Sequence, residues 1–316
     1  MSNQGKQEIL LESGTNEVEI ADFQLCGQHF GINVLKIKEF LPFEGLKIVP
    51  MVDAHPSVSG VFLLRDRTIP LVELDQHLTL KRRTRPKHEV VIVTEFNRTI
   101  TAFKADSINR IHRASWEVFE PLSSFLNVSS VVGTLTLDGR DVLVLDLEHI
   151  VGEIFPQSVI TYTKEGIHDS TESQEGRDNT KIFFAEDSNL IRNMVTNILT
   201  SVGYKSIKAF PDGQSALDAI EGCMKQAESE GKPITDYINV LLTDIEMPRL
   251  DGLSLCKRVK IDHKLPIPVI IFSSLVNEQL GFKCESVGAD ANVSKPESER
   301  LIGLIDELAL KRPATG

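Results

Sequence analysis

The hydrophobic pattern in the first half of the chain consists of short apolar runs separated by turn residues. "EVVIVTEF" and "TITAFKA" stand on either side of a turn at residues 97–99, and "VVGTLTLDGRDVLVLDL" is two such runs around Asp138-Gly139. An Asp-Gly pair between two apolar runs is a strong signal for a β-hairpin. "VEIADFQLCGQHFGINV" has the same character, with a turn near Gly27. Many short strands with frequent turns predict an all-β domain of the barrel type.

The apolar pattern weakens between residues 157 and 180, where the sequence reads "QSVITYTKEGIHDSTESQEGRDNT". From Thr163 onward this segment is rich in Ser, Thr, Glu, Asp and Gly and has few apolar residues. Such a segment buries too little apolar surface to fold alone, so it is typical of a flexible linker. We therefore predict a first domain over residues 1–156, a polar linker over 157–180 and a second domain over 181–316.

Beyond the linker, the pattern alternates between strands and helices. Apolar side chains recur at helical spacing over residues 190–199, and Gly203 can end that helix. Strand-like apolar runs cover residues 182–185, 240–242, 269–272 and 291–293. This alternation predicts an α/β domain with a parallel sheet that helices cover on both faces.

Composition and charge narrow the range of functions. The chain has 316 residues, 41% of them hydrophobic, which is enough for two domains with a core each. Its formal net charge of −11 argues against general binding to nucleic acid or to an anionic membrane surface. The four cysteines form no CxxC pair, as expected of reduced thiols. We see no signal peptide and no apolar run of the ~18 residues that a membrane helix needs, and expect a cytoplasmic protein without direct membrane insertion.

Polar side chains follow the apolar runs of the second half where each predicted strand ends. In order along the chain, they are Glu186-Asp187, Asp244, Ser273-Ser274 and Lys295. In open α/β sheets, ligands bind beyond the carboxyl ends of the strands. If these strands are parallel neighbours, three carboxylates, a hydroxyl and an ammonium group converge at one edge of the sheet.

Three neighbouring carboxylates repel one another and raise one another's pKa. Mg²⁺, which prefers oxygen ligands, relieves that repulsion. Together with Lys295 it would neutralise the oxygens of an incoming phosphoryl group, which a carboxylate can attack as a nucleophile. Asp244 would then become an aspartyl phosphate. Each residue alone has a simpler explanation, because acids favour helix N-termini and most lysines lie at the surface, but the ordered combination favours the site.

Residues 181–312 resemble a two-component response regulator receiver domain. The resemblance rests on the acidic pair, the loop "TDIEMPRLDG", the hydroxyl after the next strand and the "SKP" lysine, which occur in this order. It implies a doubly wound α/β fold with a five-stranded parallel sheet, and transfer of a phosphoryl group from a histidine kinase to Asp244. It further implies that Ser273 and Lys295 bind that group. Mg²⁺ would be held by Glu186, Asp187, Asp244 and the main-chain carbonyl of Glu246.

This sequence departs from the usual receiver pattern at a position that bears on signalling. Many receivers carry an aromatic residue three positions before the lysine, coupled to the hydroxyl, but this chain has Asn292 there. We therefore expect the signal to pass through loops or the linker rather than through a moving ring. Glu246 and Leu275 stand at positions that influence the rate of dephosphorylation in the family.

The first half holds no nucleophile elbow, P-loop or glycine-rich dinucleotide fingerprint. From about residue 18 to residue 151 it resembles the CheW-like coupling domain of bacterial chemotaxis. The stretches "FGINVLKIKEFLPFEGLKIVPMVDAHPSVSGVFLLRDRTIPLVEL" and "VVGTLTLDGRDVLVLDLEHIVG" carry this resemblance. It implies an all-β, SH3-like double barrel that binds the histidine kinase CheA and the cytoplasmic tips of chemoreceptors.

Two polar features of the first half are candidate contacts. Arg65 lies in "LRD", where the family usually has "LRG", and it is either a partner contact or part of a structural ion pair. The basic run over residues 81–88 is interpreted as a solvated loop rather than a site for a polyanion.

A coupling domain joined to a receiver predicts an adaptor that links chemoreceptors to CheA and is regulated by phosphorylation at Asp244. Such a protein would work beside membrane receptor arrays, bind no nucleic acid and catalyse nothing beyond its own dephosphorylation. The alternative is a phosphate sink, in which the receiver drains CheA and coupling does not change. A DNA-binding regulator and a receptor methylesterase are disfavoured, because the helix-turn-helix and the serine elbow are missing.

Overall fold

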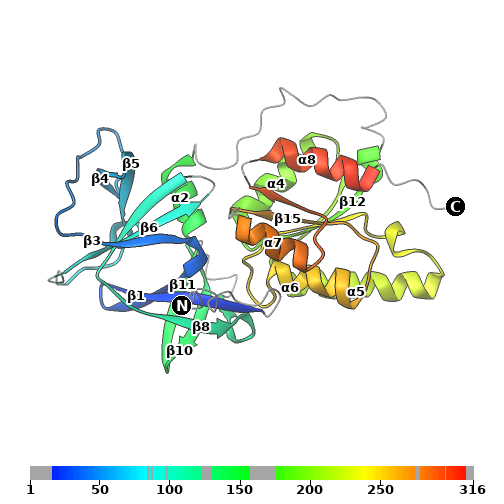
Figure 1. Cartoon of the computed structure of the whole chain (residues 1–316), viewed down its shortest axis with the longest axis horizontal. Coiled ribbons are helices and arrows are strands. Elements are labelled where there is room, and N and C mark those ends of the chain that lie inside the picture. The colour runs from blue at the N-terminus through cyan, green and yellow to red at the C-terminus, as the bar shows by residue number, and fades with distance from the viewer. Residues whose placement is uncertain are drawn as a thin grey trace, which may run out of the picture.

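The computed structural model describes residues 16–83, 86, 88–96, 99–122, 130–156, 176–274, 278–295 and 297–310. An all-β domain is followed by an α/β domain, which confirms the predicted fold class (Figure 1). Most of the predicted linker, residues 157–175, lies outside the described residues. No helix in the described part of the chain combines the length and apolar character that a membrane crossing needs.

The all-β domain contains two mainly antiparallel sheets. The first sheet has the spatial order β8 (Ser107–Ser115), β1 (Glu17–Leu25), β2 (Gln28–Asn33), β11 (Arg140–Leu145), β10 (Val131–Leu137) and β9 (Glu120–Pro121). The second has the order β3 (Ile37–Pro42), β6 (Val90–Phe96), β7 (Thr99–Ala105), β5 (Arg67–Glu73) and β4 (Val58–Leu64). Among the described residues of this domain, short helical segments include η1 (Val34–Lys36), α1 (Leu74–His77), η2 (Trp116–Val118) and α2 (Leu147–Ile154).

The predicted hairpins form in the expected places. β10 and β11 pair antiparallel around Asp138 and Gly139, whose φ angles are 50° and 74°. Positive φ at both central residues marks the turn type whose twist matches that of the strands. β1 pairs with β2 around Gly27, and β6 pairs with β7.

The main core of this domain lies between its two sheets and α2. It includes Phe23 of β1, Phe103 of β7 and Ile150 of α2, all of which are buried. Asp146 caps α2, because its side chain accepts a hydrogen bond from the main-chain N–H of His149 at 2.9 Å. The core and the cap together fix the position of the first turn of α2, which carries Glu148.

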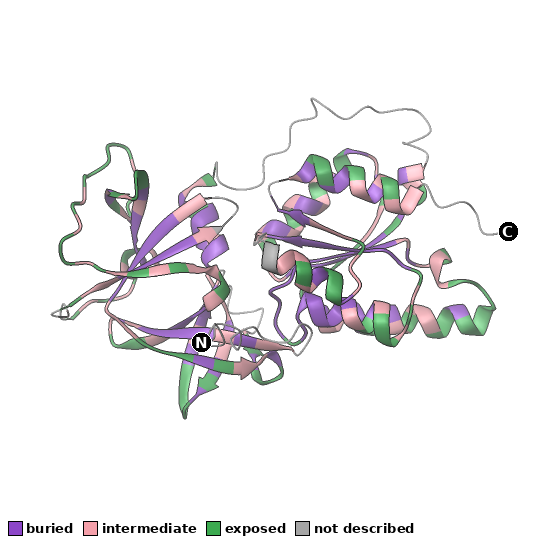
Figure 2. Cartoon of the chain, viewed as in Figure 1, coloured by how far each residue is buried: buried purple, intermediate pink, exposed green. Residues whose placement is uncertain are grey.

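The α/β domain has a five-stranded parallel sheet whose interior strands are buried (Figure 2). Its order is β13 (Ser206–Phe210), β12 (Lys181–Ala185), β14 (Val240–Thr243), β15 (Val269–Ser273) and β16 (Ala291–Ser294). One face packs against α4 (Asn189–Ser201) and α8 (Ser298–Ile305), and the other against α5 (Gly213–Glu230), α6 (Gly252–Lys257) and α7 (Glu278–Ser286). Helices on both faces make the fold doubly wound, as expected.

Two features of this domain were not evident from the apolar pattern. β13 is an edge strand whose residues are exposed or half-buried, so it lacks a continuous apolar run. The last residues of the predicted linker pack against the α/β domain, since the buried Arg177 donates to Asp306 at 2.9 Å and to the carbonyl of Val202 at 3.0 Å.

Candidate functional site

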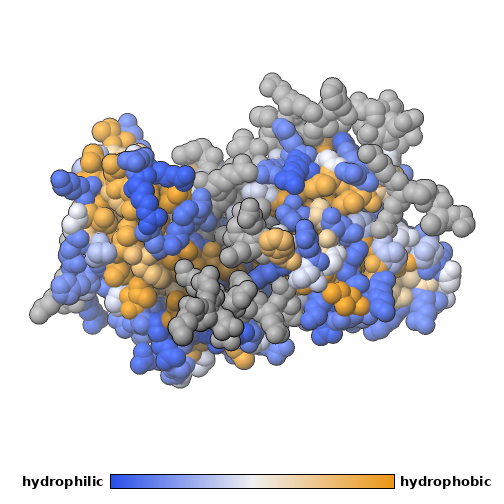
Figure 3. Space-filling model, viewed as in Figure 1, coloured by the Kyte–Doolittle hydropathy of each residue, from blue (hydrophilic) through white to orange (hydrophobic). Residues whose placement is uncertain are grey.

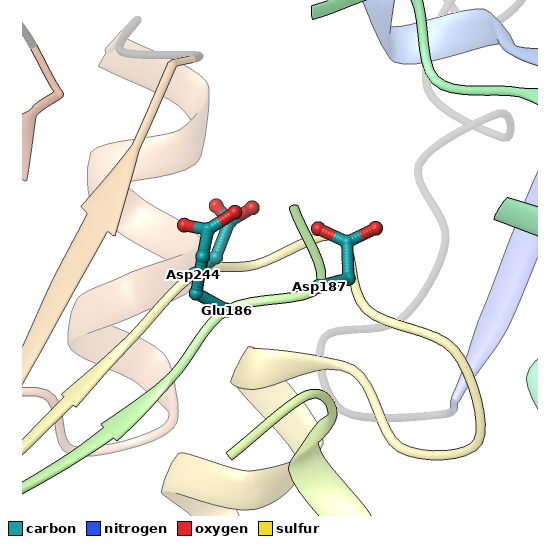
Figure 4. Close-up of side chains that lie close together, drawn as sticks. All are labelled: Glu186, Asp187 and Asp244. Carbon is teal, nitrogen blue, oxygen red and sulfur yellow. The ribbon is translucent and has the colours of Figure 1, made fainter. Parts of the chain in front are cut away.

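Three carboxylates converge beyond the ends of two neighbouring strands. Glu186 and Asp187 follow β12, and Asp244 follows β14. One oxygen of each lies within 4.8 Å of the others, the one such group of acidic, histidine or cysteine side chains among the described residues. Figure 4 shows the carboxylates of Glu186 and Asp244 side by side, with that of Asp187 facing them. The predicted convergence of these side chains is confirmed.

The register of the sheet explains why these residues meet. Ala185 pairs with Thr243 in the parallel ladder, so the residues that follow them leave the sheet at the same level. The main-chain N–H of Asp244 also donates to the carbonyl of Ala185 at 2.9 Å. The start of α6 packs closely beneath this loop, where a Cβ added to Gly252 would lie 1.7 Å from the carbonyl oxygen of Asp244. Only glycine permits that approach, which gives a physical reason for the Asp-Gly of the loop.

Lys295 lies between the carboxylates and is fully buried. Its Nζ donates to Asp244 Oδ2 at 2.9 Å and to Glu186 Oε1 at 3.3 Å. The main-chain N–H of Lys295 donates to the carbonyl of Ser273 at 3.0 Å, which places the buried Ser273 at the same edge of the sheet. The carboxylates, the ammonium group and the serine expected at this edge are therefore all located there.

Burial and mutual repulsion make the carboxylates unusual acids. Burial raises the pKa of Glu186 well above its usual value, and Asp244 and Asp187 add to the rise while Lys295 opposes it. Burial, followed by the charge of Asp146, raises the pKa of Asp187 to about 8. Burial and repulsion make the charged forms of these carboxylates unfavourable, and a bound cation would offset that effect.

The donor set fits a hard divalent cation. Glu186 Oε2 is buried and accepts no hydrogen bond, although Lys295 Nζ lies 3.1 Å away. An oxygen of this kind, beside two further carboxylates, provides the ligands that Mg²⁺ prefers. Oε2 of Glu246 forms an ion pair with Lys36 at 2.8 Å, and the main-chain carbonyl of Glu246 remains the candidate ligand.

Two residues of the all-β domain enter this site, which the sequence did not indicate. Glu148 of α2 accepts a hydrogen bond from Ser274 Oγ at 2.7 Å and another from Lys295 Nζ at 3.4 Å. Lys36 of η1 lies 2.8 Å from Glu246 and 3.4 Å from Glu148. No spacing or motif marks either residue, because their role depends on how the two domains dock.

The electrostatic balance at this contact keeps Glu148 charged. Burial alone would raise its pKa, but Lys295 and Lys36 outweigh that effect and hold the pKa of Glu148 at about 2. Lys36 and Lys295 therefore each contact carboxylates of both domains.

Asn292, the residue in place of the usual aromatic, lies within β16 opposite Ile271. The described part of this strand thus offers no ring that could move toward Ser273. Leu275, the second residue expected to influence dephosphorylation, lies outside the described residues.

The candidate residues of the all-β domain have clear structural environments. Arg65 is 77% exposed and forms an ion pair with Glu39 at 2.9 Å, so the pair is present while the guanidinium remains accessible. Arg65 and Asp66 have φ angles of 47° and 64°, so aspartate supports the left-handed turn in place of the usual glycine.

The basic run is not wholly a solvated loop. Lys81, Arg83 and His88 are exposed, but Arg82 is largely buried between Asp75 at 2.7 Å and Asp106 at 2.6 Å. Its two acidic partners attach the start of this segment to the domain. Thr84, Arg85 and Lys87 lie outside the described residues.

Comparison with known proteins identifies both domains. Residues 19–155 match the model of the CheW-like domain, and residues 182–306 match that of the response regulator receiver domain. The chain is 27% identical to chemotaxis protein CheV3 of Helicobacter pylori, over 93% of this chain and 95% of that protein. CheV1 and CheV2 of the same organism are 25% and 26% identical, over 93% and 89% of this chain and 95% and 91% of their own lengths. The similarity extends across both domains.

Proposed function

The chain belongs to the CheV chemotaxis proteins, which join a CheW-like domain to a receiver domain, and from this we propose how its parts act. The CheW-like domain links chemoreceptor tips to the histidine kinase CheA, and phosphorylation of Asp244 regulates that link. One observation carries the regulatory part of the proposal. The buried cluster of Asp244, Glu186 and Lys295 lies in contact with Glu148 of the CheW-like domain.

Exposed apolar residues of the CheW-like domain support the proposal that it binds other proteins. They lie on η1, on the second sheet and on the segment between β3 and β4, and the most exposed are Val52 at 86% and Leu63 at 68%. Figure 3 shows hydrophobic residues gathered on the CheW-like domain, at the left of the view. Leu35, Phe40, Val49 and Met51 are further exposed apolar residues of this region. Large exposed apolar patches typically bind other proteins. We call these six residues the apolar face.

The proposed reaction is the transfer of a phosphoryl group from a phosphohistidine of CheA. An oxygen of Asp244 attacks the phosphorus, the P–N bond breaks, and the released imidazole takes a proton from solvent. Lys295 neutralises oxygens of the transferred group, and the Ser273 hydroxyl donates to one of them. Mg²⁺, held by Glu186, Asp187, Asp244 and the carbonyl of Glu246, would supply the remaining positive charge.

Hydrolysis of the aspartyl phosphate completes the proposed cycle. Attack by water on phosphorus would break the bond to Asp244 and release inorganic phosphate. This self-dephosphorylation is the single catalytic step that we propose for the chain. We also propose that the protein works in the cytoplasm beside chemoreceptor arrays, because the candidate partners are placed there.

The direct test is phosphoryl transfer from labelled CheA to the whole purified chain with Mg²⁺, beside Asp244→Asn. We expect label on the wild type only, stable in acid and labile in base, as an acyl phosphate should be. Absence of label with a kinase that phosphorylates other receivers would contradict the proposed chemistry.

The contact between the domains favours regulation over a phosphate sink. A sink needs no communication between its receiver and its coupling domain, whereas Lys36 and Glu148 join them at the phosphorylation site. Comparing the affinity of CheA for the phosphorylated and unphosphorylated chain separates the two. Regulation predicts a difference, and a sink predicts equal affinities.

A further inference from the structure

The phosphorylation site is a docking surface for the CheW-like domain of the same chain. Two elements of that domain, η1 and the first turn of α2, present Lys36 and Glu148 to it. Lys36 bridges the domains by contacting Glu246 at 2.8 Å and Glu148 at 3.4 Å. Glu148 in turn accepts hydrogen bonds from Ser274 and Lys295 of the receiver.

These charges are removed from water, which makes the contact specific. The side chain of Lys36 is 15% exposed and that of Glu148 is 6% exposed, although both are long and charged. Buried charges persist only where partners satisfy them, and loss of one partner is strongly destabilising. The four charged groups Lys36, Glu148, Glu246 and Lys295 therefore form one mutually dependent network.

A second contact holds the domains in the same orientation. The side-chain amide of Asn16 donates to the carbonyl of Arg249 at 2.8 Å and accepts from the main-chain N–H of Asp251 at 3.0 Å. Asp251 caps α6, the helix that follows the Asp244 loop. Asn16 precedes β1, so this contact lies on a different element of the CheW-like domain from Lys36 and Glu148.

We propose that Glu148 occupies the place that a phosphoryl group on Asp244 requires, and that Lys36 fastens it there. Domain docking and phosphorylation then exclude one another. This inference rests on the proposed phosphorylation of Asp244 and adds how that same site is regulated. In the docked form the chain resists phosphorylation, and the phosphorylated form releases the CheW-like domain.

The exclusion follows from shared partners and from charge. Lys295 contacts Asp244 at 2.9 Å and Glu148 at 3.4 Å, so one ammonium group lies between the acceptor carboxylate and the carboxylate of the other domain. A phosphoryl group brings three acceptor oxygens and about −1.5 to −2 charges to Asp244. It would compete with Glu148 for Lys295. It would also repel Glu148, and this repulsion is strong because the contact between the domains excludes water.

The test compares phosphorylation rates of the full chain with acetyl phosphate, a donor that needs no docked kinase. Asp244 attacks its phosphorus, and acetate leaves with the electrons of the broken P–O bond. Glu148→Gln and Lys36→Met remove the two charges that hold the domains together. If about a tenth of wild-type molecules are open, both variants should be labelled up to about tenfold faster at the start.

Glu153→Gln is the matched control. Glu153 lies on the same helix as Glu148, but it is 44% exposed and pairs with His77 and His149 of its own domain. Its labelling rate should equal that of the wild type. Rates should also be independent of protein concentration, because the contact lies within one chain.

The possible outcomes separate this inference from the proposed function. Labelling of Glu148→Gln and Lys36→Met at or below the wild-type rate would overturn the inference and leave phosphorylation of Asp244 intact. A rate that falls with protein concentration would overturn it in favour of docking between two copies. Absence of label on every variant would contradict the proposed phosphorylation and the inference with it.

Discussion

The CheW-like domain has two surfaces of opposite chemistry. The surface toward the receiver carries the buried, paired charges of Lys36 and Glu148. The apolar face carries exposed side chains such as Leu63 and Val52. The two surfaces meet in η1, where Leu35 is 50% exposed beside Lys36. Charge added at Asp244 would act directly on the paired charges of the surface toward the receiver, so this surface is the one suited to a phosphorylation switch.

Removal of Mg²⁺ should give the largest effect, because it should slow labelling of Asp244 and leave binding at the apolar face unchanged. Chelation of Mg²⁺ should slow labelling of Asp244 at least about 100-fold, because Glu186, Asp187 and Asp244 would then repel the phosphoryl group. Affinity of the unphosphorylated chain for CheA should stay the same, since the apolar face holds no ligand for a cation. Labelling by acetyl phosphate and calorimetric binding measure the two effects. Loss of both properties together would mean that the metal maintains the fold instead.

A charge introduced into the apolar face should weaken partner binding and leave labelling of Asp244 unchanged. Leu63→Glu should weaken binding to CheA or to receptor tips about tenfold or more, because a carboxylate would be buried without a partner. The rate of labelling by acetyl phosphate should not change. Leu63→Met, which keeps the apolar character and similar volume, is the control. Unchanged affinity for both partners would place their binding site elsewhere.

A charge exchange should show that the contact between the domains is electrostatic. Lys36→Glu and Glu246→Lys should each speed labelling by acetyl phosphate, since each puts two like charges together. The double variant restores opposite charges and should return most of the way to the wild-type rate, with an interaction of about 1 kcal/mol. Additive effects in the double variant would show that the two residues do not act on one another.

Arg65→Ala should have the smallest effect of these changes, with almost no effect on stability. Its pair with Glu39 is largely exposed, so Arg65→Ala should change the free energy of unfolding by less than about 0.5 kcal/mol. We expect its affinity for CheA or receptor tips to fall several-fold, because the accessible guanidinium borders the apolar face. Denaturant unfolding and binding titration measure these quantities. A large loss of stability with intact binding would make the ion pair its main role.

The sequence was most informative where local pattern decides the structure. Strand ends in a parallel sheet meet at one edge, so the apolar runs before Glu186, Asp244 and Lys295 were enough to place their side chains together. The hairpin at Asp138-Gly139 followed from turn chemistry in the same way. β13 was missed because an edge strand needs no continuous apolar run.

The contact between the domains could not be predicted by this reasoning. Lys36 and Glu148 are ordinary residues of a short helical turn and of a helix start, where acids are common. Their function comes from a docking geometry that no periodicity encodes. The same holds for Arg82, whose partners Asp75 and Asp106 turn part of a basic run into a structural element.

The central claim is that phosphorylation of Asp244 releases the receiver from the CheW-like domain. Small-angle X-ray scattering of the full chain with Mg²⁺, before and after phosphorylation by acetyl phosphate, tests it most directly. We predict a larger radius of gyration after phosphorylation and no change in Asp244→Asn. An unchanged radius in a fully phosphorylated wild-type sample would contradict the claim.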